Sequence, residues 1–209
     1  MNIKEYNNCK RIPGWFGDND IETLSRLSSN IVNGTIIELG SLHGRTSYCL
    51  AKSSPTSKIF CLDYWDGSMV ASSDTFNRPY VIELFKMYTS ECPNITPVQL
   101  SHTQKITPLW EEPVDMIFID TSHENPNDWD IIKFWTPKIK KGGVLCGHDY
   151  YVENTPYPDV NQNIKNLEKI LNQTVTTSSE SSVWSFILDF EVVPQTFQAY
   201  EAQSRLLPL

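Results

Sequence analysis

The chain has 209 residues, of which 40% are hydrophobic and 20% are charged, and this length and composition fit a single α/β domain with a core of ordinary size. Its 17 Lys and Arg against 25 Asp and Glu leave a formal net charge of −8, which argues against nucleic acid or an anionic membrane as the main partner. Its 5 cysteines are odd in number and irregular in spacing, and they indicate reduced thiols in a cytoplasmic protein rather than a disulfide framework or a zinc site.

The first part of the chain is expected to be a polar arm of residues 1–14 that ends in a Pro-Gly turn. Its composition is unlike that of a signal peptide, and no run in the chain approaches the roughly 20 apolar residues of a membrane span. A helix is expected over about residues 20–31, because apolar side chains recur there at helical spacing. Asp18 or Asn19 is expected to cap this helix.

A strand, a glycine loop and a helix follow directly on one another. The apolar strand over residues 35–39 leads into a loop with Gly40 and Gly44, and a helix is expected over residues 44–53. Glycines in such a loop let the backbone turn sharply and approach a ligand closely. This arrangement predicts a nucleotide-type binding corner.

The corner departs from the dinucleotide fingerprint G-x-G-x-x-G, because Leu42 and Arg45 stand at its second and third glycine positions. The carboxylate of Glu38 at the mouth of the loop would repel a pyrophosphate and attract a cation. The loop is therefore predicted to bind a ligand that has an adenosine part and a positive charge rather than phosphates.

The rest of the chain alternates short apolar strands with helical segments, which predicts a mainly parallel sheet with right-handed crossovers. Pro97 moves the third strand towards a sheet edge. Three lysines at 138, 140 and 141 are expected at a solvated helix end, and a Gly-Gly turn at 142–143 is expected to lead into the next strand. The remaining expected strands are 58–62, 95–100, 114–119, 144–147, 174–178 and 183–189, and the remaining helices are 77–91, 127–139 and 160–172.

An acidic residue, Asp63, ends the second strand. Ligands of such sheets bind beyond the carboxyl ends of the strands, and an acid at this point can accept hydrogen bonds from both ribose hydroxyls. The alternative is an Asp that caps a turn or helix. NAD binders and S-adenosylmethionine binders share this acid, and Glu38 together with the incomplete glycine fingerprint favours S-adenosylmethionine.

Acidic and histidine side chains follow two further strands. Asp120 and His123 follow one strand, and His148 and Asp149 follow the next. Neighbouring strand ends lie close together, so Asp120, Asp149 and His148 could share a divalent ion, for which two carboxylates and water suit Mg²⁺ better than zinc. His123 would lie one short turn away as a general base for an acceptor hydroxyl. The alternative for each histidine is a satisfied structural or surface residue.

Further residues are expected around the pocket. His43 in the glycine loop and His102 after the third strand would line it. The segments 64–75 and 150–158, rich in Tyr, Trp, Ser and Pro, would overhang the strand ends and shape the substrate pocket. Trp65 is expected either to stack beside adenine or to pack structurally.

Three stretches of the chain resemble a known family. They are residues 37–47, IELGSLHGRTS, residues 61–68, CLDYWDGS, and residues 115–150, which contain FIDTSHE and KGGVLCGHDY. In this order and at these spacings the chain resembles class I S-adenosylmethionine-dependent methyltransferases over roughly residues 12–190, and more narrowly the small bacterial group of macrocin-type sugar O-methyltransferases. The resemblance implies a Rossmann-like three-layer α/β sandwich with a mainly parallel seven-strand sheet whose last strand is antiparallel.

The resemblance also implies roles for residues at matching positions. Asp120 and Asp149 match metal ligands of metal-dependent O-methyltransferases, and His123 matches their proposed base. His148 departs from the pattern, since related sugar enzymes often have an acidic residue there. The residues expected at the cofactor are Glu38 and Gly40 near its methionine part, Asp63 at its ribose, Ser101 and His102 near its adenine, and Ser41, Gly44, Tyr64, Trp65 and Asp120 around them.

The sequence therefore predicts a methyltransferase that uses S-adenosylmethionine and acts on a hydroxyl group of a sugar or other small metabolite. The expected catalytic residues are His123, as base, and Asp120, with Mg²⁺ as a candidate helper. An NAD-dependent oxidoreductase is one alternative, which the glycine-loop residues disfavour. A catalytically inactive binding module of the same fold is another, which the intact acids at the strand ends disfavour. The chain is expected to be one domain, 1–209. Its apolar tail, 190–209, is expected to pack on the domain or on a second subunit of a homodimer.

Overall fold

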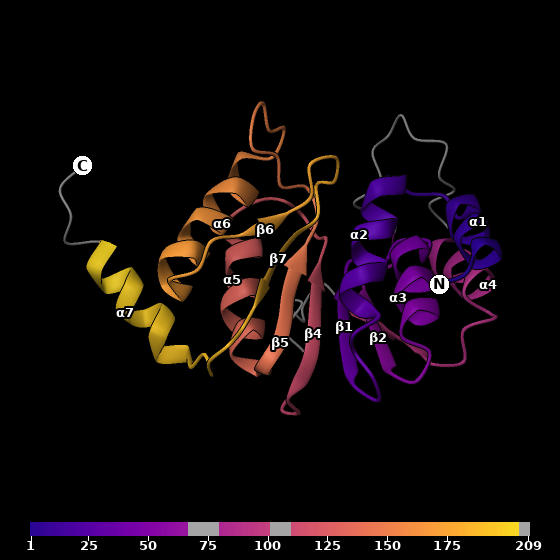
Figure 1. Ribbon diagram of the computed structural model, residues 1–209, viewed down its shortest axis with the longest axis horizontal. Helices are drawn as coiled ribbons and strands as arrows, with labels where there is room; N and C mark the ends of the chain where they lie inside the picture. The colour runs from indigo at the N-terminus through magenta and orange to yellow at the C-terminus, as the bar shows by residue number, and fades with distance from the viewer. Residues whose placement is uncertain (67–79, 101–109, 205–209) are drawn as a thin grey trace.

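The computed structural model describes residues 1–66, 80–100 and 110–204, which form a seven-stranded sheet with helices on both faces (Figure 1). The strand order is β3-β2-β1-β4-β5-β7-β6. Strands β1 to β5 are parallel, and β7 is antiparallel to both of its neighbours, which confirms the predicted sheet. The strands are β1 (Thr35–Leu39), β2 (Lys58–Asp63), β3 (Ile95–Gln99), β4 (Val114–Ile119), β5 (Ile139–Gly147), β6 (Thr176–Thr177) and β7 (Trp184–Ile187).

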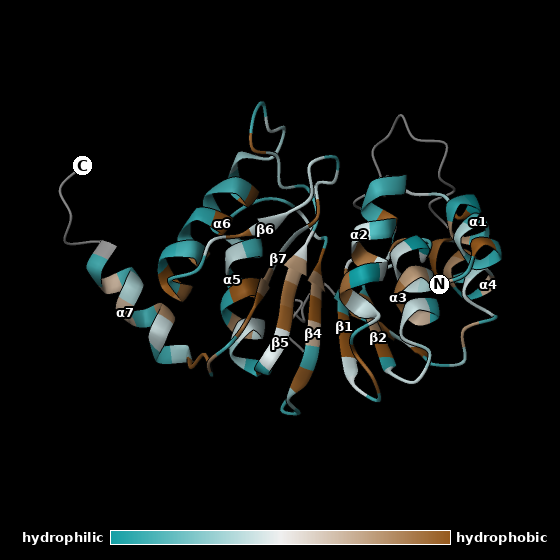
Figure 2. Cartoon of the chain, viewed as in Figure 1, coloured by the Kyte–Doolittle hydropathy of each residue, from teal (hydrophilic) through white to brown (hydrophobic). Residues whose placement is uncertain are grey.

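The helices form the outer two layers. Helices α1 to α4 pack on one face of the sheet and α5 to α7 on the other, and each face has its own buried hydrophobic cluster (Figure 1). The strands are largely hydrophobic because they are covered on both faces, whereas hydrophilic residues gather on the helices (Figure 2). The helices are α1 (Ile3–Arg11), α2 (Asp18–Ser28), α3 (Arg45–Ser53), α4 (Val81–Tyr88), α5 (Asn127–Trp135) with the 3₁₀ turn η2 (Thr136–Lys138), α6 (Pro158–Leu171) and α7 (Pro194–Ser204).

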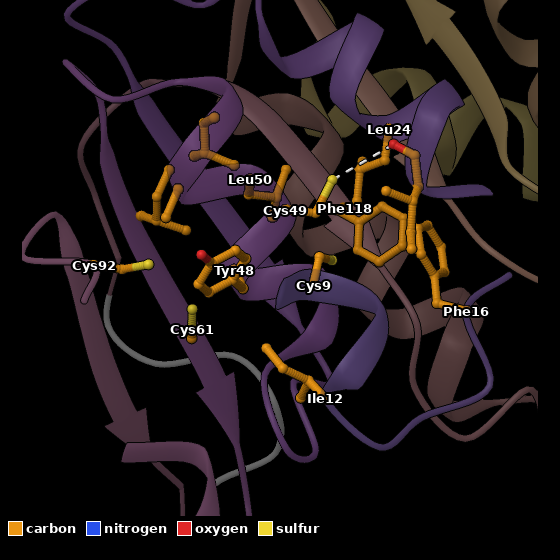
Figure 3. Close-up of a cluster of buried hydrophobic side chains, with 14 of the residues drawn as sticks. Cys9, Ile12, Phe16, Leu24, Tyr48, Cys49, Leu50, Cys61, Cys92 and Phe118 are labelled. Atoms are coloured by element: carbon orange, nitrogen blue, oxygen red, sulfur yellow. Dashed lines mark hydrogen bonds between the residues drawn. The ribbon is translucent and has the colours of Figure 1, made fainter. Parts of the chain in front are cut away.

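The predicted N-terminal arm contains a helix. Asn2 caps α1, since its side chain accepts hydrogen bonds from the backbone N–H groups of Lys4 and Glu5, and Glu5 accepts one from the backbone of Asn2 in return. The thiol of Cys9 from α1 is fully buried in the cluster drawn in Figure 3, beside Tyr48 and Phe118. The polar composition of the arm concealed this helix, which buries only one of its residues.

Strand β5 is longer than predicted, because residues 139–143 belong to it. The register against β4 shifts between Val114 and Met116, so the strand accommodates Gly142 at a φ of +83° without ending there. The prediction that the lysines end a helix holds for Lys138, the last residue of η2, but is wrong for Lys140 and Lys141, which lie in β5. Lys140 forms an ion pair with Asp115 at 2.9 Å.

The described part of the C-terminal tail, residues 190–204, packs on the domain, as one of the two alternatives predicted. Phe197 of α7 is buried against Trp129 of α5, with 5.8 Å between ring centroids. Glu201 accepts hydrogen bonds from the indole of Trp129 and from Lys133. In the described parts of the chain, every helix is too short or too polar to cross a membrane.

Candidate functional site

The carboxyl ends of the parallel strands border a cavity of about 680 Å³, a volume typical of small-molecule sites. The loops after β1, β2, β4 and β5 line it, and the segment 13–16 between α1 and α2 forms a further wall. The predicted site residues that line the cavity are Gly40, Ser41, Asp63, Tyr64, Trp65, Asp120, His123, His148 and Asp149, together with His43. Ser101 and His102 lie outside the described residues.

The glycine loop after β1 packs directly against the end of β4. Gly40 has a φ of +86°, and a Cβ atom there would lie 1.8 Å from the carbonyl oxygen of Asp120. Gly44 has a φ of +90° and is the N-cap residue of α3, and a Cβ atom there would meet the side chain of Thr89 at 2.7 Å. Both positions therefore need glycine, for close approach as well as for conformation.

Asp63 shapes this loop from the neighbouring strand. One carboxylate oxygen accepts hydrogen bonds from the backbone N–H groups of Ser41 and Leu42 at 2.7 and 2.9 Å, and the other accepts one from Trp65 at 2.8 Å. Trp65 is buried, and its indole N–H donates a hydrogen bond to the carbonyl of Leu42. Of the two alternatives predicted for Trp65, these contacts show the structural one. The Asp63 carboxylate thus caps two turns and faces the cavity, where its predicted contact with a ribose stays a prediction.

Glu38 has a different environment from the one expected. Its side chain is fully buried, and its carboxylate accepts hydrogen bonds from the hydroxyls of Ser41, Thr46 and Ser47. Burial raises the pKa of Glu38, against the lowering effect of these hydroxyls. These contacts join the glycine loop to the first turn of α3. The predicted contact of Glu38 with a cationic ligand stays a prediction, and the observed role is to hold the loop.

Arg45 explains why the third glycine of the fingerprint is replaced. It is the first residue of α3, and its guanidinium donates hydrogen bonds to the carbonyls of Ile12 at 2.6 Å, Phe16 at 2.6 Å and Lys10 at 3.3 Å. Five donors on a rigid plane suit such a set of carbonyls. Arg45 therefore links the segment 10–16, part of which lines the cavity, to the start of α3 directly after the glycine loop.

Asp120, His123 and Asp149 converge at the end of β4 and β5. The Nε2 atom of His123 lies 3.2 Å from a carboxylate oxygen of Asp120 and 2.9 Å from one of Asp149. The ring of Tyr157 packs on the imidazole at 4.5 Å. His123 and Asp149 both have left-handed backbones, with φ values of 60° and 64°. Strained backbones of this kind are typical of functional sites.

His148 connects this group to the N-terminal part of the chain. Its Nδ1 atom lies 3.4 Å from Asp149 and 3.8 Å from Asp120, and its Nε2 atom lies 3.3 Å from Asp20 in α2. Burial lowers the pKa of each of these histidines, but hydrogen bonds to the carboxylates outweigh it, so the pKa values of His123 and His148 both rise to about 10. The resting site therefore pairs carboxylates with imidazolium cations near neutral pH.

Three side chains of this site could together hold a divalent ion. Asp120, His123 and Asp149 each offer one ligand atom, and these atoms lie within 4.8 Å of one another. The predicted set contained His148 instead of His123, and the structure ties Nε2 of His148 to Asp20. Two carboxylates with an imidazole fit a first-row transition metal at least as well as Mg²⁺, which prefers oxygen ligands.

The sequence did not point to Asp20, and it included Tyr157 only as part of the segment 150–158 that was expected to shape the pocket. Asp20 lies in the expected helix 20–31, where the cap was assigned to Asp18 or Asn19. Gly17 is in fact the cap residue, and its N–H donates to Asp20 at 2.9 Å. No local pattern shows that Asp20 approaches a histidine 128 positions away, because the contact depends on how α2 packs on the sheet.

Three comparisons bear on the family. A family model described as a methyltransferase domain matches residues 37–150. The structure is similar to that of the O-methyltransferase TomG from Streptomyces achromogenes, involved in tomaymycin synthesis and solved in complex with SAM, with a TM-score of 0.59 and 12% identity over 90% of this chain and 91% of that one. It is also similar to the O-methyltransferase from Bacillus cereus in complex with SAH, with a TM-score of 0.57 and 16% identity over 90% of this chain and 92% of that one. At these identities the likeness shows the fold. No curated protein matches the chain in sequence.

Proposed function

On the premise that this chain belongs to the methyltransferase-domain family, whose model matches more than half of it, we propose that it transfers the methyl group of S-adenosylmethionine to a hydroxyl group of a sugar or similar small molecule. The observation that carries the proposal is one cavity lined both by the glycine loop with Asp63 and by the Asp120, His123 and Asp149 group. A cofactor held by the loop would present its methyl group towards that cluster. The two solved O-methyltransferases of the same fold are consistent with an oxygen acceptor.

The reaction needs little chemistry from the protein beyond alignment. The sulfonium of S-adenosylmethionine supplies a methyl group that the acceptor oxygen attacks in line, so that an O–C bond forms as the S–C bond breaks. We assign Asp63 and the Gly40 loop to hold the cofactor. His123 is an imidazolium in the resting site, so it must first release its Nε2 proton to solvent, which becomes easier when the acceptor displaces one of its two carboxylate partners. The neutral imidazole then takes the hydroxyl proton on Nε2.

Nε2 of His123 can either bind a divalent ion or accept the hydroxyl proton, but it cannot do both. A divalent ion bound by Asp120, His123 and Asp149 would occupy Nε2, which could then not accept a proton. Such an ion would instead polarise the acceptor hydroxyl. The short distances from Nε2 to both carboxylates argue against a need for the ion, because the imidazolium of His123 already compensates the negative charges.

Methyl transfer is therefore expected to survive exhaustive chelation. The measurement is the initial rate after dialysis against a strong chelator, with cofactor binding followed by calorimetry in the same buffer as control. A rate that disappears and returns on addition of Mg²⁺ or Mn²⁺ would assign the carboxylates to a metal and remove the proton-accepting role from His123.

The proposed function is tested by calorimetry with S-adenosylmethionine, S-adenosylhomocysteine and NAD, followed by a methyl-transfer screen over sugars, phenols and amines. The first two ligands are expected to bind and NAD is not, and a sugar hydroxyl is expected to be methylated. Tight NAD binding without S-adenosylmethionine binding would favour an oxidoreductase. Cofactor binding with no transfer to any acceptor class would favour an inactive binding module.

A further inference from the structure

Asp20 reaches the candidate site from outside the residues that match the methyltransferase-domain model, 37–150. It lies in the first turn of α2, and its side chain is largely buried at the cavity wall. One carboxylate oxygen lies 3.3 Å from Nε2 of His148 and also accepts the N–H of Gly17. The other accepts the hydroxyl of Ser181 at 2.8 Å and the N–H of Ser182 at 2.9 Å.

The His148 residue that Asp20 contacts has its backbone and one ring face fixed by other groups. Its N–H donates to the carbonyl of Ile119, and its carbonyl accepts the indole N–H of Trp184. The ring of Phe16 packs on its imidazole at 4.8 Å. These contacts do not determine the rotation of the imidazole about the Cβ–Cγ bond, and therefore do not decide which ring nitrogen faces Asp149. Asp20 determines that rotation, since an acceptor at Nε2 leaves Nδ1 facing Asp149 at 3.4 Å.

We propose that Asp20 is a positioning residue for the methyl transfer: by holding Nε2 of His148 it directs Nδ1 to Asp149 and so orients the carboxylate that faces His123. This inference rests on the proposed function for its catalytic meaning, whereas the chain of contacts from Asp20 to His123 stands on geometry alone. The same oxygen of Asp149 lies near both imidazoles, 3.4 Å from His148 and 2.9 Å from His123. Movement of His148 would therefore move the partner of His123.

The alternative is that Asp20 only stabilises the start of α2 and the turn before β7. The two oxygens of its carboxylate allow the roles to be separated. Ser181→Ala removes a contact to the oxygen that does not face His148, so it tests the structural role. Asp18→Asn makes the same chemical change two residues away, at a side chain that is 55% exposed and pairs with Lys10.

The experiment compares the wild type with Asp20→Asn, Asp18→Asn and Ser181→Ala. Each protein is measured by ¹⁵N NMR of the histidine rings at one pH and by calorimetry with S-adenosylhomocysteine. Its turnover is measured with the hydroxyl acceptor that the screen identifies. Asp20→Asn is expected to shift the ring signals of both His148 and His123 and to lower kcat about 10-fold or more. The KM for S-adenosylmethionine and the affinity for S-adenosylhomocysteine are expected to stay unchanged. Asp18→Asn is expected to leave all readouts unchanged, and Ser181→Ala to lower only the melting temperature.

The proposal is overturned if Asp20→Asn leaves the ring signals of His123 as in the wild type, or if it changes only the melting temperature as Ser181→Ala does. These outcomes are distinct from failure of the proposed function. A wild-type chain that binds S-adenosylmethionine but methylates nothing would refute the proposed catalysis, while the NMR comparison would still decide whether Asp20 acts on His123 through His148.

Discussion

Replacing His123 by Asn is expected to reduce methyl transfer by about 10²–10⁴-fold, the usual contribution of a positioned general base. Asn is the suitable replacement because residue 123 has a φ of 60°, a conformation that Asn tolerates better than Ala. The variant should therefore keep the backbone of the loop and lose only the proton acceptor. The measurement is kcat with the identified acceptor, and calorimetry with S-adenosylhomocysteine should show unchanged affinity.

Chemical rescue sharpens this test. Imidazole added to the buffer can enter the space left by the ring between Asp120, Asp149 and Tyr157, and it is expected to restore part of the rate of His123→Asn. Turnover that equals the wild-type rate in the variant would remove His123 from the mechanism. A loss of rate together with a lower melting temperature and no rescue would give the residue a structural role instead.

Replacing Gly40 by Ala is expected to abolish cofactor binding and to lower the free energy of unfolding by at least about 3 kcal/mol. The added Cβ atom would lie 1.8 Å from the carbonyl oxygen of Asp120, which is backbone and cannot turn aside. The ends of β1 and β4 would have to separate, because the N–H of Asp120 is hydrogen-bonded to the carbonyl of Leu39. Denaturant unfolding and calorimetry with S-adenosylmethionine measure the two effects.

Gly142 provides the matched control. It has a φ of +83°, close to the +86° of Gly40, but a Cβ atom there would meet nothing within 4 Å. Gly142→Ala should therefore cost only the left-handed strain of about 1–2 kcal/mol and leave cofactor affinity unchanged. Equal losses in the two variants would show that backbone strain, and not the contact between β1 and β4, accounts for the effect at Gly40.

The parts of the fold that depend on local patterns were predictable. The strand over residues 35–39 and the strand over 114–119 are apolar runs between clear boundaries, and both have the predicted bounds. The positions of Asp63, Asp120 and Asp149 around one cavity followed from the rule that ligands bind at the carboxyl ends of parallel strands. Order along the chain was enough to place these residues, because each ends or follows a strand.

The parts that depend on contacts between distant segments were not predictable. The glutamate at position 38 was interpreted by its charge, yet three hydroxyls from the loop and α3 enclose its carboxylate. Strand β5 extends through two glycines because a register shift against β4 accommodates them, and pairing across strands leaves no trace in local composition. The contact between Asp20 and His148 likewise arises only when α2 packs against the sheet.

All five cysteines are free and buried, so their labelling by a thiol reagent reports local unfolding of the chain. Burial raises the pKa values of the Cys92 and Cys146 thiols, that of Cys92 to about 11, so the reactive thiolate of these two residues is scarce in the folded state as well as shielded. Cys9 belongs to α1, whereas Cys146 lies within β5 with its thiol directed to the carbonyl of Ile117. The order in which a thiol reagent labels these side chains under mild denaturant therefore ranks the helical layer and the central sheet by the free energy at which each unfolds locally.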